Sequence, residues 1–196
     1  MAEKKAVDRK VLIIEAAAKS FTMFGYKATT MELVAKLAGV GKGTIYTFFA
    51  TKEELFGEII RRLTSEMKAV VVSRIDENRS FFDNLTDVMY GVLQFRETHE
   101  LVVKLTQEER EVGTSAVSEG LGALEDAVIG FIEREVRAAQ QKGELRAVNP
   151  SITAFMMIRV YLALAAEWSR RHEPLTKEEV AEQLTGLFQY GICAKG

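Results

Sequence analysis

Residues 29–55 constrain the fold of this chain most strongly, because they read as two short helices joined by a glycine turn. The first helix is predicted over residues 29–38, where apolar groups recur at helical spacing. Gly39 suits the positive φ that ends a helix, and residues 44–49 read as the next short helix. A further helix is expected to begin at Thr51. Helix, tight turn and helix form the arrangement of a helix-turn-helix motif.

Three capping boxes mark predicted helix starts, each with a threonine and a glutamate three residues apart. They span residues 29–32, 51–54 and 176–179. In such a box the threonine oxygen accepts from the third backbone amide, and the glutamate returns to the amide of the cap residue. The boxes at Thr29 and Thr51 predict that Lys42, Thr44 and Thr47 point outward.

Charge is distributed unevenly along the chain, although the net charge is only −2. Residues 1–52 hold nine Lys or Arg and four Asp or Glu, so the basic excess is confined to this head and the remainder is acidic. A basic head on an acidic body suits a nucleic-acid reader whose body stays away from phosphates. Imbalances of this size also occur on solvated faces, so charge does not decide the function by itself.

The rest of the chain is predicted to be helical. Only two prolines occur, Pro150 and Pro174, so long helices are allowed almost everywhere. The remaining predicted helices cover residues 8–24, 51–74, 80–95, 100–111, 114–141, 150–171 and 176–190. Together with the two short helices they make nine, without a persuasive strand, and the predicted fold class is all-α.

Enzymatic chemistry finds little support in the sequence. One cysteine, Cys193, and two histidines, His99 and His172, offer no metal-ligand spacing. The glycines at 39–43 follow a predicted helix rather than a strand and lack the spacing of a phosphate loop. No cofactor or metal is therefore expected. A single cysteine fits a reducing compartment, residues 1–10 lack a signal-peptide core, and no apolar run is expected to reach membrane-spanning length. The predicted location is the cytoplasm.

Residues 8–57 closely resemble the tetracycline-repressor (TetR) family of bacterial transcriptional regulators. The matching residues are Phe21, Gly25, Thr29, Thr30, Ala35, Ala38, Gly39, Val40, Gly43, Thr44, Tyr46, Phe49, Lys52 and Leu55. The resemblance implies a helix-turn-helix DNA-binding domain at residues 1–50 and a helical ligand-binding and dimerisation domain at residues 51–196. The body is somewhat similar to fatty-acid-degradation regulators that bind long-chain acyl-CoA. This similarity rests on the order of the helices, on residues 108–110 and on Trp168.

The resemblance implies a recognition helix that starts near Lys42 and enters the major groove of an operator. The residues expected to contact DNA are Thr29, Thr30, Lys42, Gly43, Thr44, Tyr46, Thr47, Phe48 and Lys52. Four of these residues are expected to donate hydrogen bonds to DNA phosphates: Thr29, Thr30, Tyr46 and Lys52. Position 48 is often tyrosine or histidine in the family. Phe48 cannot hydrogen-bond a phosphate, and packing on a thymine methyl or a sugar is the alternative contact.

The resemblance also implies a homodimer through residues 150–190, where the last two helices pair with their two-fold mates. A two-fold protein independently suits a palindromic operator. Arg159 interrupts the apolar stretch, and an ion pair or carbonyl contact is favoured over a ligand role.

The other body helices are expected to enclose a small apolar effector, with a plain packed core as the alternative reading of each residue. The candidate wall and polar residues are Phe82, Tyr90, Phe95, Arg96, His99, Leu105, Phe131, Met156, Met157 and Tyr161. Lys104, Glu108 and Arg110 are further candidates for fixing a ligand. A fatty acyl-CoA would suit such a site, and a multidrug-type pocket for aromatic or cationic compounds is equally compatible. A helical protein-binding module without DNA contact is the remaining alternative.

Overall fold

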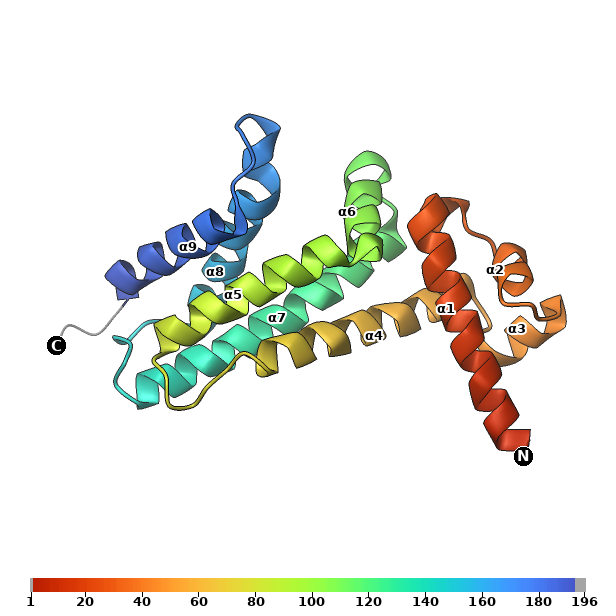
Figure 1. Cartoon of the computed structure of the whole chain (residues 1–196), viewed down its shortest axis with the longest axis horizontal. Coiled ribbons are helices and arrows are strands. Elements are labelled where there is room, and N and C mark those ends of the chain that lie inside the picture. Colours follow the sequence, from red (N-terminus) through yellow and green to blue (C-terminus); the bar gives the residue numbers. More distant parts are fainter. Residues whose placement is uncertain (1, 193–196) are drawn as a thin grey trace. The chain divides into compact units, whose positions relative to one another are not determined.

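The structure is a computed structural model that describes residues 2–192, with residues 2–8, Glu97 and Ala166 described by their backbone alone. Within this range it contains nine α-helices and no strand, which confirms the predicted all-α class (Figure 1). The helices are α1 (Ala2–Ala28), α2 (Met31–Leu37), α3 (Lys42–Phe48), α4 (Lys52–Val72), α5 (Phe81–Thr98), α6 (Glu100–Val112), α7 (Ser115–Gln141), α8 (Pro150–Leu162) and α9 (Lys177–Ile192). Cys193, used above to predict the compartment, lies outside the described residues.

Two helices differ most from their predicted extents. The first begins at Ala2 instead of Asp8 and continues to Ala28, because the chain resumes helical geometry after Gly25, whose φ of 83° and ψ of 166° are not helical. The predicted helix over residues 150–171 is regular only as far as Leu162. It continues as a π-helical turn, Ala163–Glu167, and a 3-10 turn, Trp168–Arg170.

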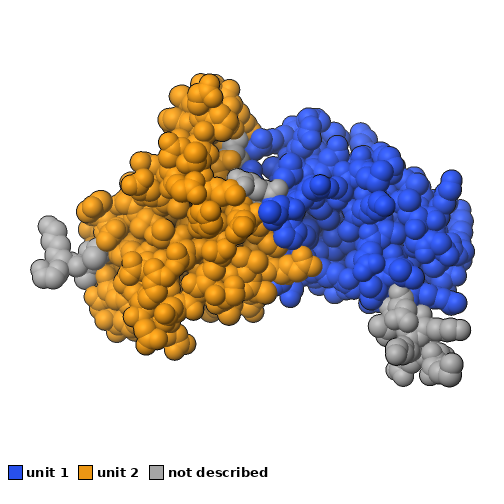
Figure 2. Space-filling view, in the orientation of Figure 1, with its two compact units in different colours: residues 1–65, 96–124 blue, residues 66–95, 125–196 orange. Residues whose placement is uncertain are grey.

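The chain divides into two compact units (Figure 2). Unit 1 comprises Met1–Ser65 and Arg96–Leu124, and unit 2 comprises Glu66–Phe95 and Glu125–Gly196. Helices α4, α5 and α7 each contribute residues to both units. The units do not follow the predicted boundary at residue 50, because α6 packs on α1. The assignment of residues 1–50 as the DNA-binding domain concerns function and stays a prediction.

The core of unit 1 holds the helix-turn-helix segment on α1 and α4. Its most deeply buried side chains include Ile13, Phe21, Ile45, Leu55, Leu105 and Val117. The rings of Phe21, Tyr26 and Phe56 pack with centroids 4.8 to 5.5 Å apart. The start of α7 approaches α4 closely at Gly120, where an added Cβ would lie 2.7 Å from Phe56 Cε1.

The core of unit 2 is formed by α5, the second half of α7, α8 and α9. It includes Phe82, Leu85, Met89, Val92, Val136, Met157, Tyr161, Leu184 and Phe188. Each large apolar side chain contributes roughly 1.5–3 kcal/mol when fully buried, so this cluster dominates the stability of the unit. The hydroxyls of Thr86 on α5 and Thr185 on α9 form a hydrogen bond of 3.0 Å at its edge.

Apolar side chains on α8 and α9 remain exposed in the described chain. On α8, Ile152, Phe155 and Met156 recur at spacings of three and four and are between 48% and 58% exposed. On α9, Leu187 and Tyr190 are 57% and 93% exposed. Residues at these spacings share one face of a helix. Both helices therefore carry an apolar face that nothing in the described chain covers.

One described stretch, Pro150–Arg170, is apolar and long enough to cross a membrane by length and composition alone. The prediction that no apolar run reaches such a length is therefore wrong for this stretch. Core helices of water-soluble proteins pass the same test. Here α8 places Ala154, Met157 and Ile158 in the core of unit 2, as expected for a core helix.

Candidate nucleic-acid interface

The helix-turn-helix segment is fixed by local hydrogen bonds. Thr30 caps α2, its hydroxyl oxygen accepting from the Leu33 amide at 3.2 Å. Gly39 takes a φ of 65°, and the Val40 amide then donates to the Ala35 carbonyl at 3.0 Å. This hydrogen bond closes the C-terminal turn of α2, as in other glycine-terminated helices.

The first capping box does not form as predicted, because the cap residue is Thr30 rather than Thr29. The Glu32 side chain consequently does not accept a hydrogen bond from the backbone amide of the cap residue. Its carboxylate instead pairs with the ammonium of Lys42, the first residue of α3, at 2.5 Å. The hydrogen bond and charge of this pair raise the pKa of Lys42 and lower the pKa of Glu32. The ion pair joins the two helices of the motif at their exposed surface.

Thr29 was predicted to contact phosphate, and the structure corrects this. The side chain is only 1% exposed. Its hydroxyl donates to the Gly25 carbonyl at 2.8 Å and forms a 2.9 Å hydrogen bond with the Ser20 hydroxyl. Thr29 therefore anchors the start of the motif to α1, and its hydroxyl has no path to a nucleic acid.

Lys52 was also predicted as a phosphate contact, but its ammonium is largely used inside unit 1. It donates to the carbonyls of Tyr26 and Thr29 at 3.0 and 3.1 Å and lies 4.2 Å from the Tyr26 ring centroid. The Tyr26 hydroxyl donates to Glu53 Oε1 at 2.8 Å. Burial and this carboxylate raise the pKa of Tyr26 well above its ordinary value, and the same hydrogen bond lowers the pKa of Glu53. Lys52 thus joins the end of α1 to the start of α4.

The remaining predicted contacts gather on α3 and on the residue before α2. Thr30, Lys42, Gly43, Tyr46 and Thr47 are exposed, and Thr44 and Phe48 are half-buried. On the opposite side of α3, Ile45 is fully buried and Phe49, just after the helix, is 5% exposed. One face of α3 therefore packs on the core and the other presents an ammonium, hydroxyls and open backbone at Gly43, as a DNA-reading helix requires.

Glu108 on α6 holds the end of α1 in place, a role that the sequence did not reveal. The side chain is 7% exposed. Its carboxylate accepts from the amides of Tyr26 and Lys27 at 2.5 and 2.9 Å, and from the Thr114 hydroxyl at 3.3 Å. The sequence predicts Glu108 as a ligand contact, but these hydrogen bonds use its carboxylate inside unit 1. Its two backbone partners, the amides of Tyr26 and Lys27, lie more than eighty residues away in the chain, and no local pattern could indicate them.

Gly25 makes this contact possible, and we expect Gly25→Ala to lower the free energy of unfolding by roughly 2–4 kcal/mol. Its backbone lies in a region that essentially only glycine adopts. An added Cβ would also lie 2.6 Å from Glu108 Oε2. Gly39→Ala is the matched control, because Gly39 also has a positive φ but nothing within 4 Å, and it should cost about 1 kcal/mol. Urea denaturation compares them, and equal losses would contradict the role of the Glu108 contact.

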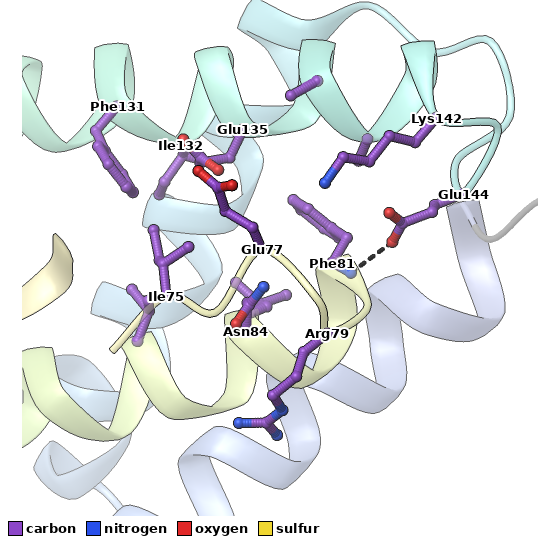
Figure 3. Close-up of a pocket in the computed structure, with 14 residues that line it drawn as sticks. Ile75, Glu77, Arg79, Phe81, Asn84, Phe131, Ile132, Glu135, Lys142 and Glu144 are labelled. Carbon is purple, nitrogen blue, oxygen red and sulfur yellow. Dashed lines mark hydrogen bonds between the residues drawn. The ribbon is translucent and has the colours of Figure 1, made fainter. Parts of the chain in front are cut away.

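Four of the predicted effector residues meet in unit 2, where Phe82, Met157 and Tyr161 lie in the packed core and Phe131 packs against it. Phe82, Phe95, Leu105, Met157 and Tyr161 are buried, Met156 is 51% exposed, and Tyr90, Arg96 and His99 are half-buried. A cavity of about 450 Å³ lies elsewhere in unit 2, between the α4–α5 connection, α5 and α7, and Phe131 is the one predicted residue that lines it (Figure 3). Arg159 forms an ion pair with Glu125 of the same chain at 2.6 Å, and its predicted place inside a dimer interface stays a prediction.

An all-helical chain with a glycine-turned helix pair and an exposed basic, hydroxyl-rich recognition helix defines a helix-turn-helix transcriptional regulator. The family described as bacterial regulatory proteins, tetR family, matches residues 13–59. The HTH-type transcriptional regulator YhgD of Bacillus subtilis is 47% identical over 189 residues, covering 96% of this chain and 99% of that protein. The chain belongs to the TetR family.

Solved structures show the same fold. One from Clostridium perfringens, named as a fatty acid metabolism regulator, has a TM-score of 0.68 at 21% identity and covers 94% of this chain and 100% of its own. AibR, solved with isovaleryl coenzyme A and operator DNA, has a TM-score of 0.63 at 23% identity over 91% of this chain and 97% of its own. The matching family and the Bacillus subtilis relative are transcriptional regulators and not enzymes.

Proposed function

We propose that this regulator is a homodimeric repressor that binds a palindromic operator in the cytoplasm and releases it when a small effector binds the body. The observation that carries the DNA-binding part is the two-sided character of α3. Ile45 is buried on one side, while Lys42, Tyr46 and Thr47 are exposed on the other. A helical protein-binding module would not need an ammonium and hydroxyls around an open glycine backbone.

The dimer is supported by the exposed apolar faces of α8 and α9. A symmetric contact through residues 150–190 would bury these faces from water, including Ile152 and Phe155 on α8 and Leu187 and Tyr190 on α9. One recognition helix reads few base pairs, and a two-fold dimer presents two of them to successive half-sites. The apolar faces would therefore support DNA binding by holding two recognition helices in one dimer.

Effector binding would act by shifting a population of two body arrangements. Helix α4 is the natural carrier, because its first part lies in the core of unit 1 and its last residues belong to unit 2. Its side chains Leu63, Met67 and Val71 are buried, so repacking around them would act on the helix directly. A ligand that favours one arrangement would then change the spacing of the two recognition helices.

For the effector itself, a fatty acyl-CoA is one candidate, supported by the fold shared with AibR and the Clostridium perfringens protein. A multidrug-type specificity for aromatic or cationic compounds is the second. Carboxylates on the lining of the unit 2 cavity favour this second candidate, because they repel phosphates and attract cations.

DNA binding is tested by a mobility-shift titration against palindromic segments from upstream of the chain's own gene. We expect Tyr46→Phe to weaken binding to every sequence several-fold, and Lys42→Ala to reduce the salt dependence of binding by about one unit of slope. Thr47→Val should change the preferred sequence. Lys68→Ala removes the same charge from an exposed position of α4 and should leave binding unchanged. The absence of any salt-sensitive, specific complex would refute the proposal.

A further inference from the structure

The cavity of unit 2 has the size and lining of a small-molecule site. Its volume of about 450 Å³ falls in the range of ligand pockets, which are mostly apolar with a few polar groups. The apolar part of its lining consists of Ile75, Phe81, Leu85, Val88, Phe131, Ile132, Ala138 and Ala139. These residues come from the α4–α5 connection, the start of α5 and the second half of α7, all within unit 2 (Figure 3).

Charged side chains line the same cavity, and some of them are already engaged. The Glu144 carboxylate accepts a hydrogen bond from the Phe81 amide at 2.5 Å, so it is already engaged at the first residue of α5. Arg79 points away from the cavity and pairs with Asp87. Glu77, Glu135 and Lys142 form no hydrogen bond or ion pair through their side chains with the described residues. Two carboxylates and one ammonium therefore remain available to a ligand.

The arrangement of these groups favours a positive charge in the cavity. Figure 3 shows Glu77 reaching from the α4–α5 connection toward α7, where Glu135 projects into the same part of the cavity beside Ile132. Lys142 follows the end of α7, is exposed on a long flexible side chain, and can turn toward solvent. Like charges placed together over an apolar surface are relieved most directly by a bound cation. The ring of Phe131 borders the same space, and the Arg134 guanidinium already lies 5.6 Å from its centroid, so the ring offers a ligand apolar contact.

We propose that this cavity binds an organic cation, an amine or quaternary ammonium group on an apolar body. The cationic head lies between the carboxylates of Glu77 and Glu135, and the body packs on Phe131, Ile132 and Leu85. This assigns the effector class, and of the effector residues predicted from the sequence Phe131 lines the site. The role of the ligand as an effector rests on the proposed function, but its binding to the cavity does not.

Three probes with one apolar body and different heads test the binding: phenylbutylamine, phenylbutanol and phenylbutanoate. Isothermal titration of the full chain without DNA should show one amine per chain, bound about tenfold more tightly than the alcohol, with the carboxylate weakest. Glu77→Gln and Glu135→Gln should each weaken the amine on the order of tenfold and leave the alcohol unchanged. Glu133→Gln is the matched control, because Glu133 lies on the same helix, pairs with Arg137 and does not line the cavity.

Equal binding of the three probes would overturn the proposal, as would amine binding that both cavity substitutions leave unchanged. The effector role is read separately by adding the amine to a complex with operator DNA. Release of DNA from the wild type, but not from the Glu77→Gln/Glu135→Gln double variant, supports it, and unchanged DNA affinity refutes it. If no DNA segment is bound at all, the proposed function fails while calorimetry still decides the cavity.

Discussion

Glu108→Ala should lower the free energy of unfolding by about 3–4 kcal/mol. The carboxylate accepts from two backbone amides and one hydroxyl while it is 7% exposed. Removing it leaves these donors without an acceptor in a buried place, and each unsatisfied group costs about 1–3 kcal/mol. Urea denaturation followed by circular dichroism measures the loss.

Two companion variants make this result specific. Glu111→Ala removes the same charge from an exposed position one helical turn along α6 and should change stability by less than about 0.5 kcal/mol. Glu108→Gln keeps one acceptor oxygen but turns an amide group toward one of the donors, so it should fall between the two. If Glu108→Ala unfolds no more easily than Glu111→Ala, the carboxylate does not hold the end of α1.

The largest expected effect on DNA binding comes from the apolar faces of α8 and α9. The Ile152→Glu/Leu187→Glu double variant should convert the proposed dimer to a monomer, because each substitution would bury a carboxylate in an apolar contact. A single recognition helix then binds each half-site alone, and the apparent affinity for a palindrome should fall on the order of 10²–10⁴-fold. Light scattering and DNA titration measure the two effects.

Val103→Glu provides the comparison, because it places the same charge at an exposed apolar position of α6 that the proposed dimer does not use. The Val103 side chain is 50% exposed, similar to the substituted residues on α8 and α9. This variant should remain dimeric and bind DNA normally. A wild-type chain that is monomeric in solution, or a double variant that still dimerises, would show that these helices do not form the subunit contact.

Local features of the fold were predictable because their causes are local. The third capping box forms completely, with the Glu179 amide donating to Thr176 Oγ1 at 3.2 Å and the Thr176 amide donating to the Glu179 carboxylate at 2.7 Å. In the second box, Thr51 accepts from the Glu54 amide at 3.1 Å, but Glu54 accepts from the Ala50 amide instead of that of Thr51. Sequence spacing therefore locates helix starts to within about one residue.

The candidate site was predictable only where neighbouring residues determine exposure. Tyr46 and Thr47 are exposed because their helix is short and Ile45 faces the core. Thr29 and Lys52 look like surface residues in the sequence, yet their side chains donate to the carbonyls of Gly25 and Tyr26 at the end of α1. Such partners depend on the kink at Gly25, which no spacing rule describes.

Effector residues could not be predicted because helical periodicity identifies buried faces without separating a packed core from the wall of a cavity. Phe82 and Met157 lie on buried faces and fill the core of unit 2. The sequence does not single out Glu77 and Glu135, since charged residues in a connection and on a long helix are usually solvated. Only the folded arrangement places them around one space.

The contact between Glu108 and the end of α1 bears on how regulators of this kind can be recombined. An exchange of residues 1–50 between two such proteins would separate Tyr26 and Lys27 from the carboxylate that accepts their amides, and Tyr26 from Glu53. The recipient would then supply these partners only if its own α6 and α4 carried matching groups. A functional chimera of this chain therefore needs the DNA-reading segment, the start of α4 and α6 from the same parent.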